Sequence, residues 1–485
     1  MTRKDRIGPR PLRLLAALTL VAGQMATAVP VSAQSLTFVE VWSQTVSDGS
    51  PISLSSPNLA TLGGASAVVV GDKGGHIYAF SLATGAPIPG WPATTGGVPV
   101  GSTPSVAVLR SGSPNDTVFV GTGSAGAPHE GGYEAFRPDG KELWYVAVHN
   151  PGASYKSGVV ASLAVGDLQG STDVVAPSVG QHQDAINAAT GAVLPGFPWF
   201  QGDGDYATPA LADLYGTGKT EIIEGGGQTA GLAFGVHYVQ GGHVRVLAPT
   251  GNAGTNSPPG GLICDYHPHQ SVDSSPAVGR FLAGGAEGIA IGTGNFWPRA
   301  RDTDAFLALD RHCHLVWSTI LDGLTTSSPA LANLFGNGAL EVVEGSNDQH
   351  GGGSVYALNG ATGSVLWRQR APGEVIGSVV TANLGAGYQD IIVAATGGAE
   401  VLDGRTGKVM ATLEQGVGLQ NSALVTDDPN GSVGITVAGY NAHDIGTVEH
   451  FQLPGSQGRN VDQAGAWPMF HHDPRLSGNA EAPIL

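Results

Sequence analysis

The chain has little charge and no long apolar run. Among its 485 residues, Asp, Glu, Lys and Arg together make up 13%, whereas hydrophobic residues make up 41% and glycine accounts for 75 positions. This composition is too apolar for a disordered chain and is typical of many short strands joined by glycine turns. The apolar run near the N-terminus covers residues 14–23, and no later run approaches the roughly 20 residues that a bilayer span needs. The sequence therefore predicts no transmembrane span.

Positive charge is the scarcer sign. Lys and Arg number 22 against 39 Asp and Glu, which gives a net charge of −17. A protein this acidic has no long-range attraction for nucleic acid or for anionic membranes. We therefore expect no nucleic-acid partner.

The N-terminus departs from this charge pattern, because five basic residues precede the apolar run. Val31-Ser32-Ala33 then supplies small residues of the kind found before a signal-peptide cleavage point. Loss of residues 1–33 would remove five positive charges and one negative charge, which lowers the net charge from −17 to −21. The sequence predicts a signal peptide over residues 1–33 and a secreted protein, either extracellular or periplasmic.

A short motif recurs through the rest of the chain. "ATPALADLYGTGKTEIIEG" (Ala207–Gly225) and "SSPALANLFGNGALEVVEG" (Ser327–Gly345) are nearly the same, and weaker copies share their register. Self-similarity of this kind, with copies 44 to 67 residues apart, is the signature of a repeat architecture. We call the Ser or Thr before the Pro position the anchor of each repeat. The anchors are Ser56, Thr103, Ser162, Thr208, Ser275, Ser328, Ser378 and Ser422.

Each repeat has the strand pattern of a propeller blade. After the anchor strand come a second β-rich run, a glycine loop, a third run, a turn that often reads Ala-Thr-Gly, and a fourth run that often carries Trp. Four short strands per repeat without helical periodicity are typical of a β-propeller. Proline is tolerated on an edge strand, so we expect the prolines after the anchors on the first strand, at the edge facing the channel. These are Pro57, Pro104, Pro209, Pro276 and Pro329.

Eight anchors predict one all-β domain, an eight-bladed propeller over residues 34–455, with seven blades as the alternative. The last repeat has three clear strands, the third ending at Thr447–Phe451, and "EVWSQ" (Glu40–Gln44) matches the fourth-strand pattern. We expect this N-terminal strand to complete the last blade and close the ring. Residues 456–485 are expected to form a C-terminal tail.

Three stretches resemble known propeller families. "VYALNGATGSVLW" (Val355–Trp367) and "AWPMFHHDPRLSG" (Ala466–Gly478) resemble the PQQ-like repeats of secreted bacterial proteins. "ADLYGTGKTEIIEG" (Ala212–Gly225) resembles the FG-GAP or VCBS repeat of integrin-type propellers. The resemblance implies the fold of the mature chain but not its function, because such propellers include dehydrogenases, lyases, adhesins and assembly scaffolds.

The residues do not favour the cofactors that the resemblance suggests. FG-GAP loops bind calcium through several carboxylates, but Tyr215 and Thr217 replace the middle acids between Asp213 and Glu221, and Ca²⁺ takes at least six oxygen ligands. The PQQ-dependent dehydrogenases of the resembled family carry a docking Trp in most blades and an adjacent cysteine pair near the quinone. Neither feature is complete here, so we expect neither calcium nor PQQ and name no other cofactor.

Cysteine is scarce, with only Cys264 and Cys313 present. Two thiols in an exported chain usually pair, and these two fall on adjacent repeats. We therefore predict a disulfide. The alternative is a metal site formed by Cys264, His267, His269, His312 and His314.

Histidine gathers in the loops of one propeller face. The loops between second and third strands carry His129, His182, His237, His350 and His443, and the loops from a fourth strand to the next blade add His149, His267 and His269. Histidine is a common ligand of transition metals, so a first-row metal site is one interpretation, with His129, His237 and His350 best placed. Solvated polar loop residues are the simpler interpretation, which the sequence favours, and we assign no metal ligand.

The sequence contains no familiar catalytic motif, neither His-Glu-x-x-His nor Gly-x-Ser-x-Gly. It favours a monomeric, non-catalytic binding or scaffold module that holds an extracellular protein, glycan or metal on the histidine-bearing face. The alternatives are a metal-dependent propeller enzyme similar to polysaccharide lyases and a PQQ-dependent dehydrogenase.

Overall fold

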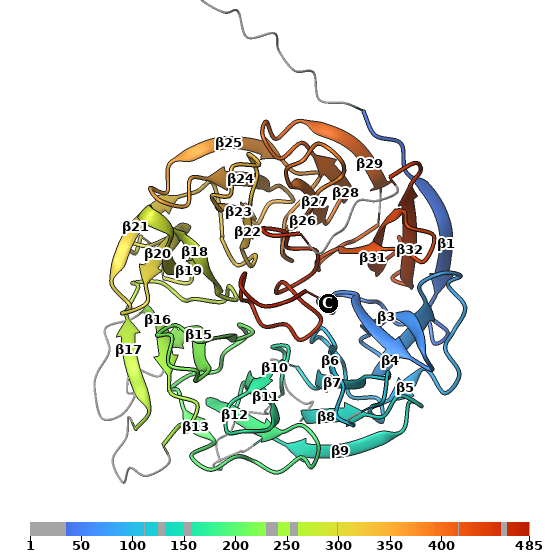
Figure 1. Ribbon diagram of the computed structural model, residues 1–485, viewed down its shortest axis with the longest axis horizontal. Helices are drawn as coiled ribbons and strands as arrows, with labels where there is room; N and C mark the ends of the chain where they lie inside the picture. Colours follow the sequence, from blue (N-terminus) through green and yellow to red (C-terminus); the bar gives the residue numbers. More distant parts are fainter. Residues whose placement is uncertain are drawn as a thin grey trace, which may run out of the picture. The chain divides into compact units, whose positions relative to one another are not determined.

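Eight four-stranded antiparallel sheets form a ring (Figure 1). The computed structural model describes residues 35–110, 112–124, 131–148, 158–228, 241–252, 260–297, 299–415, 417–456 and 463–484. The helical structure among these residues is one 3-10 turn, η1 (Ala283–Gly285). The described residues contain no helix that is long and apolar enough to cross a membrane. The predicted eight-bladed β-propeller is confirmed, and the alternative of seven blades is wrong. The predicted signal peptide, residues 1–33, lies outside the described residues.

Each blade runs from an inner first strand to an outer fourth strand. Blades one to four consist of β2 (Asn58–Leu62), β3 (Ala65–Gly71), β4 (His76–Ser81) and β5 (Ala93–Thr94); β6 (Ser105–Ala107), β7 (Thr117–Gly121), β8 (Gly132–Phe136) and β9 (Glu142–Ala147); β10 (Ala164–Asp167), β11 (Thr172–Pro177), β12 (His182–Asn187) and β13 (Trp199–Phe200); β14 (Ala210–Ala212), β15 (Glu221–Gln228), β16 (Gly241–Leu247) and β17 (Leu262–Tyr266). Blades five to eight consist of β18 (Ala277–Leu282), β19 (Ala286–Gly292), β20 (Ala305–Asp310) and β21 (Leu315–Ile320); β22 (Ala330–Ala332), β23 (Glu341–Gly345), β24 (Ser354–Leu358) and β25 (Val365–Arg370); β26 (Val380–Ala382), β27 (Asp390–Ala395), β28 (Gly398–Leu402) and β29 (Val409–Gln415); β30 (Leu424–Asp427), β31 (Val433–Tyr440), β32 (Gly446–Leu453) and β1 (Val39–Thr45).

The N-terminal strand completes the last blade, as predicted. β1 pairs antiparallel with β32, from Val39 opposite Gln452 to Thr45 opposite Thr447. This pairing covers the edge of the eighth sheet, which would otherwise present unpaired backbone groups. The first and last parts of the propeller domain are thereby joined in one sheet (Figure 1).

The fourth-strand Trp of one blade packs against the Ala-Thr-Gly turn of the next blade. Trp42 donates its indole N–H to the carbonyl of Leu82 in the next blade at 2.9 Å. Gly85, in the same turn, has φ +71°, and a Cβ there would collide with the Trp42 ring. Glycine is therefore required both by the backbone conformation and by the ring that covers it. The same pairing occurs for Trp144 with Gly191, Trp317 with Gly363 and Trp367 with Gly407.

The anchors form a hydrogen-bonded circle around the channel. The backbone N–H of each donates to the hydroxyl of the next at seven of the eight junctions, at 2.8 to 3.1 Å. The prolines that follow five of the anchors lie immediately before the first strands, one residue earlier than we predicted. Because proline has no N–H, it leaves no unsatisfied donor at this crowded edge.

The C-terminal segment lies in the centre of the ring (Figure 1). Its carbonyl groups accept hydrogen bonds at or beside the first strand of every blade. The donors are the Asn58 amide and the backbone N–H groups of Val106, Val165, Leu211, Val278, Asn333, Thr381 and Val425. Trp467 and Leu476, both 0% exposed, fill the space between them. The described part of the predicted tail, residues 463–484, is thus an internal plug that satisfies the inner edges of the blades.

Candidate functional site

The channel opens on one face as a small cavity. Its volume is about 230 Å³, its floor includes Phe470 of the plug, and its wall carries the anchor hydroxyls. We call this side, where the first strands begin, the anchor face. The rim consists of the residues two positions before each anchor: Leu54, Gly101, Val160, Tyr206, Asp273, Thr326, Ile376 and Gln420. The repeat thus places one side chain per blade around the opening.

The rim has an apolar and an acidic part. Leu54, Val160 and Ile376 contribute aliphatic side chains, and Leu54 is 43% exposed. On blades four and five, Tyr206 is 40% exposed and lies close to Asp273. Burial raises the pKa of Asp273, and the nearby Asp203 carboxylate adds to the rise. A ligand that brings a cationic or hydrogen-bond-donating group would be favoured at this part of the rim.

A buried group of charged side chains supports the acidic part from below. Asp205 accepts the N–H of Gly227 and so fixes the loop that carries Tyr206 to β15. His243 Nε2 lies 3.3 Å from Asp205 and 3.7 Å from Glu224. Burial raises the pKa of Glu224 to about 7, although the Arg245 guanidinium opposes the rise. Burial, helped by the charge of Arg245, lowers the pKa of His243 well below its ordinary value, which keeps the ring neutral.

Sequence reasoning did not single out this buried group. The signal was present in "GHVRVL" (Gly242–Leu247), where His243 and Arg245 alternate with valines on a strand that is buried throughout. Because this strand is buried on both faces, its polar and charged residues must find partners inside the protein. The partners come from β15 and from the loop before β14, and only the folded ring brings these together.

The five candidate histidines do not form a common site among the described residues. His129 and His237, and also His149, lie outside those residues. His182 is buried, with Nδ1 2.7 Å from the carbonyl of Gly180. His350 and His443 are exposed on blades six and eight. The candidate site therefore stays an untested hypothesis for the pair outside the described residues.

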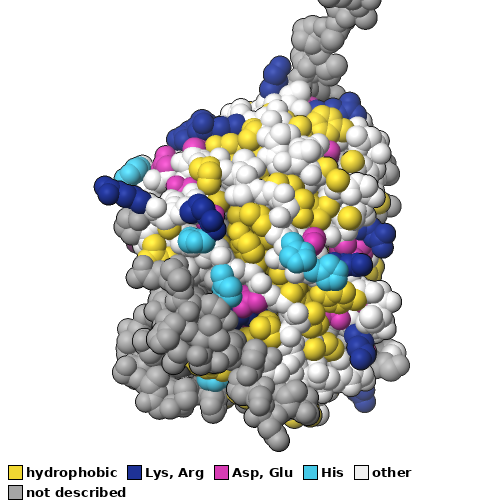
Figure 2. Space-filling model, turned by 90° about the vertical axis from the view of Figure 1, so that its left-hand side faces the viewer, with side chains coloured by type: hydrophobic (Ala, Val, Ile, Leu, Met, Phe, Trp, Pro, Cys, Tyr) yellow, Lys and Arg dark blue, Asp and Glu magenta, His cyan; other side chains and the backbone are white. Residues whose placement is uncertain are grey.

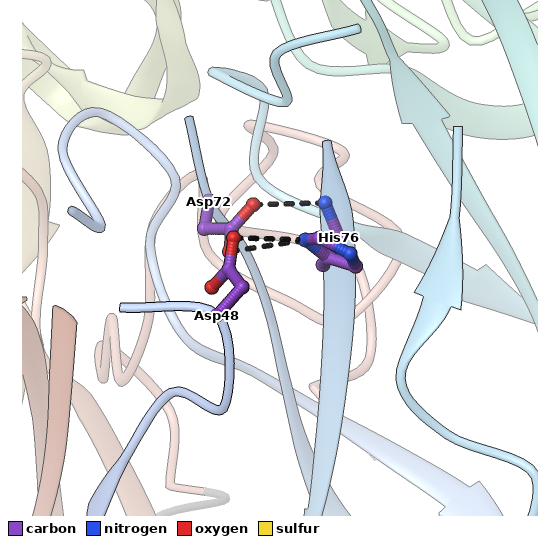
Figure 3. A group of neighbouring side chains, drawn as sticks. All are labelled: Asp48, Asp72 and His76. Carbon is purple, nitrogen blue, oxygen red and sulfur yellow. Dashed lines mark hydrogen bonds and ion pairs between the residues drawn. The ribbon is translucent and has the colours of Figure 1, made fainter. Parts of the chain in front are cut away.

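One group of potential metal ligands does occur on the anchor face, on blade one. Asp48, Asp72 and His76 place three ligand atoms within 4.8 Å of one another, and no other group in the described part of the chain does so (Figure 3). His76 lies at the start of β4, as the candidate histidines lie beside the third strands of their blades. His76 was not among the histidines named from the sequence.

In the acidic turn that resembles an FG-GAP loop, the carboxylates accept hydrogen bonds from the turn's own backbone. Asp213 accepts the N–H groups of Thr217 and Gly218, and Glu221 accepts that of Leu214. Both carboxylates therefore stabilise the turn between β14 and β15. The resemblance to FG-GAP repeats remains one of sequence pattern.

The two cysteines form the predicted disulfide, which joins β17 of blade four to the turn before β21 of blade five. With both sulfurs oxidised, neither can supply a thiolate to a metal. The alternative site of Cys264 and Cys313 with neighbouring histidines is therefore wrong for this oxidation state.

Comparison with known proteins identifies others that share this fold. Residues 242–436 match the family described as outer membrane protein assembly factor BamB. BamB from Moraxella catarrhalis has a TM-score of 0.53 at 15% identity, over 86% of this chain and all of its own. Residues 242–436, less than half of the chain, thus resemble PQQ-like repeats within an eight-bladed β-propeller. No curated protein sequence matches the propeller.

Two dehydrogenases also share the propeller fold. Quinohemoprotein alcohol dehydrogenase ADHIIG from Pseudomonas putida HK5 has a TM-score of 0.58 at 12% identity, over 87% of this chain and 77% of its own. A europium-containing methanol dehydrogenase has a TM-score of 0.56 at 12% identity, over 86% and 93%. At such identities the likeness concerns the fold, so function has to be argued from the propeller's own residues.

Proposed function

We propose that the protein is an exported binding scaffold whose anchor face holds another protein. The observation that carries the proposal is the plug. Residues 463–484 occupy the centre of the ring and leave a cavity of about 230 Å³ at the anchor face. Small-molecule and cofactor sites are commonly about 300–1,000 Å³. A cavity below that range suits one side chain that protrudes from a larger partner.

The rim suggests the chemistry of that side chain. Its aliphatic part would contact the stem of a lysine or arginine, and its acidic part, around Asp273, would receive the charged end. The net charge of −17 would attract a basic partner from a distance. The match of residues 242–436 to an assembly factor supports a role in protein binding, and the predicted signal peptide and the disulfide support an oxidising compartment outside the cytoplasm.

A PQQ-dependent dehydrogenase is the second candidate, because a quinohemoprotein alcohol dehydrogenase and a methanol dehydrogenase share the fold. A quinone in the channel would have to coexist with the plug, whose Trp467 is fully buried. The dehydrogenase pattern of a docking Trp in most blades is also incomplete, with the Trp contact described at four junctions. We therefore favour the binding scaffold. No residue of the rim favours a polysaccharide-lyase-like reaction.

Site-specific crosslinking in the native host tests the proposal. A photo-reactive amino acid at Tyr206 should give a discrete adduct with one protein, and Asp273→Asn should weaken it. The same probe at Lys219, exposed in the turn between β14 and β15 on the opposite face, is the matched control. Absence of an adduct at Tyr206, or the same adduct at Lys219, would contradict the proposal. Stoichiometric uptake of added PQQ by the purified protein would favour the dehydrogenase instead.

A further inference from the structure

The loop after β1 and the turn between β3 and β4 bring two carboxylates to one imidazole. His76 Nδ1 lies 3.1 Å from Asp48 Oδ2 and 3.6 Å from Asp72 Oδ2. Figure 3 shows all three side chains pointing toward one another. Ligands about 2.1 Å from a tetrahedral metal ion are separated by roughly 3.4 Å. The two distances therefore match the edges of a coordination shell.

In each carboxylate one oxygen accepts hydrogen bonds, and the other lies near His76. Asp48 Oδ1 accepts the Tyr78 hydroxyl at 2.9 Å and the Ser50 N–H at 3.1 Å. Asp72 Oδ1 accepts the N–H of His76 at 2.8 Å. These bonds orient the carboxylates as outer-shell partners orient metal ligands. The second oxygen of each faces His76, and neither Asp72 Oδ2 nor His76 Nδ1 has a hydrogen-bond partner, although Asp72 is 0% exposed.

Four other blades have a hydroxyl residue at the position of Asp72. The N–H of Asp72 donates to the carbonyl of the first residue of the third strand. In blades two, three, five and six, the residue that makes this bond is Thr122, Ser178, Thr293 or Ser346. A hydroxyl there can donate as well as accept, and Ser346 donates to Asp322. Only blade one among these has a carboxylate, which when ionised can only accept. A buried acceptor without a donor is costly unless a cation or proton accompanies it.

A glycine makes room for the second carboxylate. A Cβ at Gly74 would collide with Asp48 Oδ2. The turn Lys73-Gly74-Gly75 thus lets the loop after β1 approach blade one closely. Asp48 and His76 are partly exposed, with side-chain exposures of 23% and 28%. The group is therefore open to solvent on one side, where an ion can enter and a water molecule can complete its shell.

We propose that Asp48, Asp72 and His76 bind a first-row divalent metal ion at the anchor face. Two carboxylate oxygens and one imidazole nitrogen suit Zn²⁺ or Mn²⁺, and the two negative charges balance the ion. Asp48 follows the strand that closes the ring, so the ion fastens that strand's loop to blade one. The site is separate from the channel mouth, and it stands whether or not a partner protein binds there.

Calorimetric titration of the purified protein with Zn²⁺ and Mn²⁺ at 1 M NaCl tests the site, because the Debye length of about 3 Å removes diffuse attraction to the acidic surface. We expect one saturable site. Asp72→Ser, which introduces the residue found in blades three and six, and His76→Gln should each weaken it by more than the roughly 10–100-fold that an outer-shell change costs. Gly74→Ala should weaken it by displacing Asp48. His350→Ala, an exposed histidine in the same class of loop, should have no effect.

Two further readouts separate ligation from a structural effect. X-ray absorption spectra of the zinc-bound protein should show one imidazole in a shell of nitrogen and oxygen ligands, and a chelator should lower the thermal midpoint of the wild type but not of His76→Gln. If Asp72→Ser does not fold, His76→Gln still tests the site, because the His76 side chain is partly exposed to solvent. Lack of saturable binding at 1 M NaCl, or equal binding by the wild type and both ligand variants, would overturn the proposal and leave an ion pair of His76 with two carboxylates.

Discussion

Seven of the eight anchor hydroxyls each hold the backbone of the blade before it. Ser162 Oγ accepts the N–H of Thr103 at 2.8 Å, and both residues are at least 96% buried. A buried N–H that loses its acceptor costs free energy because water cannot replace it. The recurrence of Ser or Thr at this position therefore has a structural cause, and it also brings the anchors of seven blades to the wall of the channel mouth.

The anchors allow a matched test of this role. Ser162→Ala should lower the free energy of unfolding by about 1–3 kcal/mol, since it orphans the Thr103 N–H. Ser378→Ala removes a hydroxyl that is equally buried but has no hydrogen-bond partner within the described part of the chain. It should be nearly neutral. Urea unfolding of both variants, with unchanged m-values, is the measurement. Equal destabilisation would show that packing and not the hydrogen bond explains the anchor.

The two nearly identical stretches also repeat a buried glutamate. Glu224 on β15 and Glu344 on β23 occupy the same position of their blades, and each is at most 1% exposed. Opposite them in the register lie Arg245 in blade four and Tyr356 in blade six. The same residue type therefore belongs to a charged cluster in one blade and, in the other, has its pKa raised well above the ordinary value by burial. The role of a residue type that recurs in the repeat therefore depends on the residue opposite it on the neighbouring strand.

At the scale of the element, the closing strand β1 joins a crowded group of acids. Glu449 on β32 lies opposite Ser43 of β1. Burial, together with the charges of Glu414 and Glu40, raises its pKa to about 8. The folded state therefore holds a proton that the unfolded state loses above a pKa of about 4.3. The stability of the ring closure must fall as the pH rises between these two values.

Glu449→Gln tests this pH dependence. The variant should match the wild type near pH 4.5 and be more stable by about 1–2 kcal/mol near pH 8.5, a range already reduced for the partial exposure of the group. Denaturant unfolding between these pH values is the measurement. Glu142→Gln, at an exposed position of the outer strand β9, is the control and should not change the slope. A parallel pH profile for Glu449→Gln and the wild type would contradict the assignment.

At the scale of the whole molecule, the plug makes the ring a closed unit. Pro474 and Arg475 accept from blades two and three, and Ser477 and Gly478 accept from blades four and five. Each bond contributes a net 0.5–1.5 kcal/mol or so, and burial of Trp467 adds a few more. Against a total stability of about 5–15 kcal/mol, this segment is a large share of what holds the blades in place.

Truncation after Ser456 should therefore abolish cooperative folding or sharply lower the thermal midpoint. Trp467→Ala isolates the packing contribution and should cost about 3–5 kcal/mol. Phe470→Ala is the control, because Phe470 lies at the floor of the mouth and is only partly buried. Calorimetry of the three proteins is the measurement. A truncated protein that unfolds as cooperatively and as late as the full chain would refute the role of the plug.

The repeat pattern was sufficient to predict the blades. Anchor spacing gave eight units in one register, and "EVWSQ" matched the fourth-strand pattern closely enough to predict the pairing of β1 with β32. The disulfide could be predicted because an exported chain with two thiols has one pairing available. These features follow from local strand propensity and from the need to cover a sheet edge, both of which are written in short stretches of sequence.

The position of the tail and the composition of the sites were decided by tertiary structure. "AWPMFHHDPRLSG" resembles a stretch of PQQ-like repeats, yet its carbonyl groups accept hydrogen bonds from residues as far as 416 positions away in the sequence. Asp48 and His76 lie on separate elements, and only the hydrogen bonds of the folded blades show that Asp72 occupies the position of Ser178 and Ser346. Sequence by itself determines what each blade can form, because strand pairing is local in a propeller. Which side chains meet at the mouth, at the seam and in the channel depends on closure of the ring, since only closure brings distant loops within bonding distance.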